Sequence, residues 1–185
     1  AHLPRKFKFA INGAKEDRTI LLCHDVGIEL KKNKEINNGE LTADIYAGGG
    51  MGRTPILGSL IKQNLPWQLL PSYLTALLRV YNRFGRRDNL YKARIKILVK
   101  ALSPEEFARQ VEGEWTHIKN GDDNFTQVEW GRVAKHFSKP DYKKLQALTN
   151  EQVTHQAGES DRTAFARWLK RNVKSHQVPG YASVI

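Results

Sequence analysis

The strongest structural constraint in this chain is a cluster of four glycines within residues 48–52. The cluster follows residues 41–47, which predict a strand, and precedes Pro55, which suits the first turn of a helix. Glycine tolerates positive φ and lacks a Cβ atom, so a ligand can approach the backbone and successive N–H groups can converge on an anion. The alternative is a sharp turn without a ligand, and the cluster alone leaves both open.

Length and composition limit the class of protein. At 185 residues the chain can bury the core of one domain and carry an appendage. No run approaches the roughly 18 apolar residues of a membrane span, and the first residues lack the apolar core of a signal peptide, so we expect a cytoplasmic protein without membrane association. The single cysteine, Cys23, excludes an internal disulfide and any cluster held by several cysteines of this chain alone.

The net charge of +11 is concentrated in the first hundred residues. These hold 18 Lys and Arg residues against 8 Asp and Glu, whereas residues 101–185 hold 12 against 11. The excess favours an anionic partner, whether nucleic acid, a carboxylated or phosphorylated cofactor, an acidic protein or a small oxyanion. Charge alone does not choose among them, and a solvated basic face is the plainest alternative.

Residues 6–11 alternate charged and apolar side chains with the period of a strand. The alternation predicts Lys6 and Lys8 on one face, with Phe7, Phe9 and Ile11 on the other. Two lysines about 7 Å apart repel each other unless solvent or an anion lies between them. They are therefore candidates for anion binding, and the alternative is an edge strand that uses lysines to discourage aggregation.

The remaining sequence patterns predict strands in the first part of the chain and helices in the rest. Further strands are predicted at residues 19–24 and 26–30. The apolar spacing then becomes helical, which predicts helices at about 56–64, 69–84, 92–102, 104–115, 128–137, 141–148 and 162–173. If 92–102 is one helix, Arg94 and Lys96 need not share a face, and only one of them would meet a ligand. Residues 178–185 resemble the start of a strand.

Several separated motifs resemble one known family in their order and spacing. They are Leu-Pro-Arg-Lys-Phe-Lys at 3–8, the triple glycine after a strand, the basic residues of 82–89 and 92–96, and Glu-Phe with Val-Glu at 106–107 and 111–112. Together they resemble the first haem-binding catalytic domain of the sirohaem-dependent sulfite and nitrite reductases. The resemblance covers about residues 1–116 and extends more loosely to residues 180–181, similar to the linker into that family's second half.

The resemblance implies an α+β fold, with a mixed or antiparallel β-sheet, packed helices and a mainly helical C-terminal extension. Residues 1–118 would form a sirohaem-binding half-domain, and residues 119–185 a helical linker toward the second half. Sirohaem carries eight carboxylates, which would account for the basic excess.

The resemblance also assigns roles to individual residues. Lys6 and Lys8 would be catalytic, because cations near a bound oxyanion stabilise its charge and donate protons as oxygen leaves. The cofactor would be bound by Arg5, Gly48, Gly49, Gly50, Arg53, Arg87 and Arg94. No residue of this chain is expected to bind a metal.

The lysine at position 8 is similar to the sulfite-reducing branch, since nitrite-reducing relatives tend to have asparagine there. We therefore expect a piece of an assimilatory sulfite reductase haemoprotein, which reduces sulfite to sulfide with six electrons. The alternative within the family is a sirohaem nitrite reductase, which forms ammonia. A flavoprotein or ferredoxin would supply the electrons.

The sequence also departs from the family pattern. The four cysteines that hold the family's 4Fe-4S cluster are absent, as are two active-site arginines from a preceding domain. We therefore expect this chain to be an excised central piece that is inactive alone.

The rival hypothesis is a basic nucleic-acid-binding module with Tyr46, Tyr81, Tyr91 and Phe84 as stacking groups. No recognised nucleic-acid motif supports it, and we expect no nucleic-acid partner.

Overall fold

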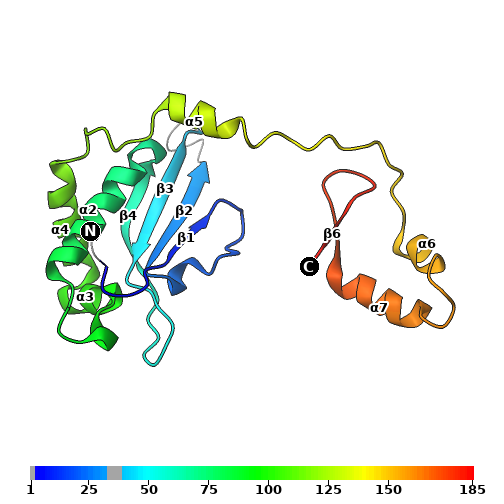
Figure 1. Cartoon of the computed structure of the whole chain (residues 1–185), viewed down its shortest axis with the longest axis horizontal. Helices are drawn as coiled ribbons and strands as arrows, with labels where there is room; N and C mark the ends of the chain where they lie inside the picture. The colour runs from blue at the N-terminus through cyan, green and yellow to red at the C-terminus, as the bar shows by residue number, and fades with distance from the viewer. Residues whose placement is uncertain (1–2, 33–38) are drawn as a thin grey trace. The chain divides into compact units, whose positions relative to one another are not determined.

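The computed structural model describes residues 3–32 and 39–185. The chain divides into two compact units, Ala1–Val133 and Ala134–Ile185. In the first unit a β-sheet lies beside a group of helices, whereas the second contains short helices and a two-stranded ribbon (Figure 1). Among the described residues, no helix is both long and apolar enough to cross a bilayer.

The sheet of the first unit has four strands in sequence order: β1 (Phe9–Asn12), β2 (Val26–Lys32), β3 (Leu41–Ala47) and β4 (Ser59–Pro66). Strands β1 and β2 are parallel, whereas β2, β3 and β4 are antiparallel neighbours (Figure 1). The sheet is therefore mixed. The predicted connection at 31–39 lies largely outside the described residues.

Three helices supply the other half of the core: α2 (Leu70–Phe84), α3 (Ile95–Leu102) and α4 (Pro104–Thr116). Helix α2 buries Tyr73, Leu77 and Val80, which lie three to four residues apart and so form one stripe. Helix α4 begins at the predicted cap, where the Ser103 hydroxyl accepts the N–H of Glu106. These stripes pack with the buried strand residues in one core, which confirms the predicted α+β class.

The strand predicted at residues 19–24 is wrong. Residues Leu21–Cys23 form a turn of 3₁₀-helix, η1. The Asp17 carboxylate accepts the N–H groups of Thr19 and Leu21, both at 2.9 Å, and Ile20 takes a φ of 53°. A local side-chain acceptor has therefore displaced the strand pairing that apolar composition favoured.

The helix predicted at about 56–64 is also wrong, because this segment forms β4. Gly50 and Ile56 exchange backbone hydrogen bonds of 2.9 and 3.1 Å, which turn the chain back along β3. Asn64 then takes a φ of 53° at an irregularity in the pairing, and its N–H donates to the buried Asp44 carboxylate. Ile61 and Leu65 are both buried, and their spacing of four residues resembles that of a helix.

The first strand is shorter than the alternating pattern of residues 6–11 predicts. Strand β1 starts at Phe9, after Lys6 and Lys8, and it buries Ala10 and Asn12. Phe9 and Ile11 are 42% and 54% exposed. The alternation is real, but the smaller side chains face inward.

The second unit contains α6 (Asn150–His155), α7 (Arg162–Asn172) and the antiparallel pair β5 (Val173–Ser175) and β6 (Ala182–Val184). The helix predicted at 141–148 is absent, because that segment packs against the chain near Gly180. The Lys143 N–H donates to the Tyr181 hydroxyl at 2.9 Å. Helix α5 (Gln127–Ala134) precedes this unit, and the domain boundary predicted at 118 stays a prediction.

The triple glycine ends β3, and its glycines are required by contacts within the chain. Gly48 has a φ of +88°, and a Cβ there would lie 2.9 Å from the Val99 side chain. At Gly49 a Cβ would lie 2.2 Å from the Leu22 carbonyl oxygen and 2.4 Å from that of His24. The chain's own backbone therefore leaves no room for a side chain at Gly49.

We predict that Gly49→Ala destabilises the first unit by about 1–3 kcal/mol or more, because the methyl group forces two carbonyl groups apart. Urea denaturation followed by circular dichroism measures the change. Gly113→Ala is the matched control, since nothing lies within 4 Å of its Cβ position in α4. That control should be stabilised by roughly 0.5–1 kcal/mol. Equal stability of Gly49→Ala and the wild type would contradict the packing argument.

Candidate functional site: a basic cleft

The main candidate site is a cleft of about 820 Å³ in the first unit. Its volume lies within the range of roughly 300–1,000 Å³ that is usual for small-molecule sites. The residues that line the cleft are Arg5, Lys6, Met51, Gly52, Arg53, Thr54, Arg86, Tyr91, Lys92, Arg94, Lys96 and Ile97.

Positive charge dominates this cleft. Seven of the twelve lining residues are Lys or Arg, and none of these twelve described residues is Asp or Glu. Like charges gathered around one concave surface create a positive potential that concentrates anions. The cleft is therefore suited to a ligand with several negative charges.

Three segments that are distant in the sequence meet at the cleft. Arg5 and Lys6 come from the chain before β1, and Arg53 from the loop between β3 and β4, which projects beyond the end of the sheet in Figure 1. Arg94 and Lys96 come from the start of α3. The fold thus gathers the charges that the sequence distributes over its first hundred residues.

Asp25 connects these segments beneath the cleft. Its carboxylate is fully buried, and one oxygen accepts from Arg94 Nε at 2.9 Å and Nη2 at 2.7 Å. The other oxygen accepts the backbone N–H of Lys8 at 3.1 Å, and the Asp25 carbonyl oxygen accepts the Gly48 N–H at 3.0 Å. One residue therefore ties the lysine segment, the triple glycine and the basic α2–α3 connection together.

Arg94 and Lys96 both line the cleft, and the expectation that only one of them meets a ligand stays a prediction. Both can line it because Arg94 is the extended residue before α3, which starts at Ile95. The direction of the Arg94 side chain is therefore not set by the 3.6-residue period of the helix. Burial, followed by the charge of Arg94, lowers the pKa of Lys96, while the charge of Asp25 acts in the opposite direction.

Arg5 is held at the cleft by the 3₁₀ turn η3 (Leu90–Lys92). Its Nη1 donates to the Leu90 carbonyl oxygen at 3.3 Å, and its guanidinium lies 5.8 Å from the centre of the Tyr91 ring. Next to this turn, the buried Tyr81 hydroxyl donates to the Ala93 carbonyl oxygen at 3.2 Å. Burial is the main reason that the pKa of Tyr81 is raised.

The predicted site residues divide into two groups. Arg5, Lys6, Arg53 and Arg94 line the cleft together. Lys8, Gly48, Gly49, Gly50 and Arg87 do not line it. Lys8 has an exposed side chain, and Arg87 Nη2 donates to the Asn82 side-chain oxygen at 2.7 Å. Gly48 instead lines a neighbouring pocket of about 460 Å³.

Sequence reasoning missed Asp25, Arg86, Tyr91, Lys92 and Lys96 as parts of the site. Lys92 and Lys96 belong to the basic motif, so the motif itself was the available signal. Asp25 had none, because a single acidic residue after a predicted strand resembles any surface carboxylate.

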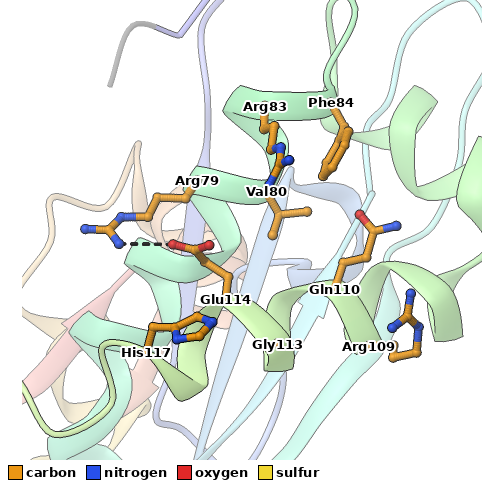
Figure 2. Close-up of a pocket in the computed structure, with 9 residues that line it drawn as sticks. All are labelled: Arg79, Val80, Arg83, Phe84, Arg109, Gln110, Gly113, Glu114 and His117. Atoms are coloured by element: carbon orange, nitrogen blue, oxygen red, sulfur yellow. Dashed lines mark hydrogen bonds and ion pairs between the residues drawn. The ribbon is translucent and has the colours of Figure 1, made fainter.

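A second groove, of about 440 Å³, lies between α2 and α4. Figure 2 shows Arg79 of α2 reaching Glu114 of α4, and their ion pair measures 3.0 Å. Arg109 is likewise paired with Glu106 at 2.7 Å, and Arg83 lies over the Phe84 ring. Two of its three arginines are therefore paired with carboxylates, whereas in the cleft Arg86 and Arg94 are the paired ones among seven cations. This groove is therefore a weaker anion site than the cleft.

The described residues contain no group of three or more His, Cys, Asp or Glu side chains placed to hold a metal ion. The class that the fold defines is an α+β domain, in which a mixed sheet with packed helices carries a cleft lined mainly by cations.

Comparisons with known proteins identify the family. The family described as "Nitrite and sulphite reductase 4Fe-4S domain" matches residues 1–119. This chain belongs to the nitrite and sulfite reductase family.

Individual relatives agree with the family match. The chain is 30% identical over 115 residues to "Sulfite reductase [ferredoxin] 1" of Mycolicibacterium paratuberculosis, covering 62% of this chain and 20% of that protein. It is 31% identical over 139 residues to "Sulfite reductase [NADPH] hemoprotein beta-component" of Chromohalobacter salexigens, covering 65% and 23%. The structure of the Mycobacterium tuberculosis NirA protein matches with a TM-score of 0.55 and 28% identity, covering 63% and 20%. The chain thus spans about a fifth of the length of these relatives.

We predict that Asp25→Asn destabilises the first unit by about 3–5 kcal/mol, because it leaves the Arg94 guanidinium without its buried counter-ion. Chemical denaturation at neutral pH gives the difference in the free energy of unfolding. Asp88→Asn is the control, since it breaks an ion pair with Arg86 that is exposed to solvent, and we expect little change there. A similar small effect of both substitutions would show that Asp25 does not organise the site.

Proposed function

We propose that this chain supplies the sirohaem-binding and oxyanion-binding half of the active site in an assimilatory sulfite reductase haemoprotein. The observation that carries the proposal is the cleft in which Arg5, Lys6, Arg53 and Arg94 converge without a carboxylate among the lining residues. Membership of the family supports it. The reaction of the parent protein would be the six-electron reduction of sulfite to sulfide.

The donor set of the cleft fits a tetrapyrrole with many carboxylates. Guanidinium groups pair with carboxylates through parallel N–H donors, and lysines add charge with freely rotating donors. Arg5, Arg53 and Arg94 would hold the carboxylates, with Arg87 and the Gly48–Gly50 backbone near the edge of the site. Sirohaem, when bound, supplies the iron centre at which electrons reach the substrate.

Lys6 and Lys8 are proposed to act on the oxyanion. Lys6 lines the cleft with an exposed side chain, and an ammonium there stabilises the charge of a bound oxyanion and donates a proton as oxygen leaves as water. The backbone of Lys8 is fixed by Asp25, while its side chain stays exposed to solvent. Asp25 thereby positions the lysine segment without touching the substrate.

The residues of this chain do not fit the family's iron–sulfur cluster. Four cysteine thiolates are the usual ligands of a 4Fe-4S cluster, and this sequence has only Cys23. The cluster ligands of the parent protein would come from outside this sequence. We therefore propose that the 185-residue chain alone does not reduce sulfite, that residues 1–118 are the cofactor-binding half-domain and that residues 119–185 are a helical linker.

The electron donor of the parent protein is proposed to be a ferredoxin or a flavoprotein. Similar proteins are named as ferredoxin and as NADPH sulfite reductases, so both kinds of donor occur among the relatives. Nitrite is the alternative substrate, because the matching family includes nitrite reductases. Lys8 favours sulfite by its resemblance to the sulfite-reducing branch.

Nucleic acid is disfavoured as a partner by the position of one proposed stacking residue. Tyr81 is buried and its hydroxyl is bonded to the Ala93 carbonyl oxygen, so its ring face is not available to a base. Tyr91 and Phe84 are exposed. Their exposure alone does not define a nucleic-acid surface.

We predict that the chain binds sirohaem with a change in its Soret band, and that Arg53→Gln weakens binding about fivefold, as expected for one solvent-exposed ion pair. Arg83→Gln is the control, because it removes the same charge from the groove between α2 and α4. Its affinity should equal that of the wild type. Equal weakening in both variants would indicate attraction by net charge alone.

The same titration is repeated with a single-stranded oligonucleotide at two salt concentrations. Tight, salt-sensitive oligonucleotide binding with no Soret change would overturn the proposal in favour of the nucleic-acid module. Adding sulfite or nitrite to the sirohaem-loaded chain then compares the two substrates, and a larger spectral shift with nitrite would contradict the sulfite assignment.

A further inference from the structure

Lys96 is a buried lysine whose ammonium contacts backbone carbonyl oxygens. It is 8% exposed on the first turn of α3. Its Nζ donates to the Thr54 carbonyl oxygen at 2.7 Å and to the Gly50 carbonyl oxygen at 3.3 Å. Among the described residues, no carboxylate forms an ion pair with this Nζ. Lys96 is also one of the residues that line the cleft.

The two acceptors belong to the loop that forms one wall of the cleft. Gly50 and Thr54 stand on either side of the turn that carries Arg53, and Gly50 pairs with Ile56 at the base of the loop. The stem of Lys96 passes close under Gly50, where an added Cβ would lie 3.2 Å from Lys96 Cδ. Lys96 therefore ties α3 to both sides of this loop.

An ammonium has three N–H donors, and the described contacts of Lys96 use two of them. A buried charge is costly unless its donors are satisfied and an opposite charge is near. The charged groups around Lys96 are Arg94, which repels it, and Asp25, which attracts it. The Asp25 carboxylate is already paired with Arg94. The Lys96 ammonium therefore keeps one N–H donor and its positive charge for a ligand in the cleft.

We propose that Lys96 has two tasks in the cleft: two of its N–H groups fix the loop that carries Arg53, and the third binds a carboxylate of the polyanionic ligand. The second task rests on the proposed function, since it assumes that sirohaem is the ligand. The first task concerns the protein alone. Lys96 is thus a cofactor-binding and positioning residue that acts beside Arg94.

The test uses Lys96→Met in the 185-residue chain, because methionine keeps an unbranched apolar stem and removes the ammonium. Lys100→Met is the matched control, being the same substitution on the same helix at an exposed position. Amide hydrogen exchange at Gly50 and Ile56, whose N–H groups close the loop, reports the first task. Sirohaem titration, followed by the Soret band, reports the second.

We expect Lys96→Met to speed exchange at Gly50 and Ile56 and to weaken sirohaem binding about 10- to 100-fold, the range for loss of a charged hydrogen bond. Lys100→Met should change neither. Unchanged exchange and unchanged affinity in Lys96→Met would overturn the inference while leaving the proposed function intact. Faster exchange with unchanged affinity would overturn the ligand contact. A wild-type chain that binds no sirohaem would overturn the proposed function and the ligand contact, but the exchange result would still test the loop contact.

The pH profile of sirohaem binding separates a ligand contact from a purely structural one. Burial lowers the pKa of Lys96, so its ammonium is lost at a lower pH than that of an ordinary lysine. Affinity should therefore fall as the pH rises through this lowered pKa, and Lys96→Met should remove that step. The other titratable groups that line the cleft, Lys6, Lys92 and Tyr91, are the same in both proteins and cancel in the comparison. Identical pH profiles would overturn the ligand contact.

Discussion

The buried ion pair between Asp25 and Arg94 is the interaction on which the rest of the site depends. Both oxygens of the buried Asp25 carboxylate accept hydrogen bonds, as a charged group removed from solvent requires. Through Asp25, the segment before β1 is connected to Arg94, the residue before α3. All four strands of the sheet lie between these two segments in the sequence. The geometry of this ion pair explains how the segment before β1 and the start of α3 can present cations to one cleft.

The triple glycine shows how one sequence feature can serve two purposes. Its sequence suggested a surface for an anion, and the structure shows that Gly48 and Gly49 are required by the chain's own side chains and carbonyl groups. At Gly50 the neighbours are the stems and head groups of Arg94 and Lys96, both of which line the cleft. The tight packing of the glycines thus determines where the cations lie, which links the packing of the turn to the chemistry of the site.

The parts of the fold that could be predicted are those in which local pattern and tertiary packing agree. Helices α2 and α4 were predictable, because one has a continuous apolar stripe and the other a Ser-Pro-Glu-Glu start. Strand β4 was not, since an irregularity at Asn64 gives its buried residues a helix-like spacing. In the site, the separated sequence motifs pointed to Arg5, Lys6, Arg53 and Arg94, and these four residues line one cleft. Lys96 belongs to the same basic motif as Arg94, but the motif does not show that its side chain is buried. The buried Asp25 could not be found in this way, because an isolated charged residue gives no periodic signal until its partners are known.

Two cations of the cleft, Arg5 and Lys96, are oriented by backbone carbonyl groups, whereas Arg86 and Arg94 are paired with carboxylates. Arg5 donates to the Leu90 carbonyl oxygen, and Lys96 to those of Gly50 and Thr54, so these side chains are already ordered before any ligand arrives. Backbone dipoles orient a charge but do not neutralise it, and the mutual repulsion of the cluster raises the free energy of the folded state. Any polyanion that fills the cleft relieves this repulsion and stabilises the native chain by mass action. If such a ligand binds, the free energy of binding adds to the free energy of unfolding, and the empty protein is then the less stable of the two forms.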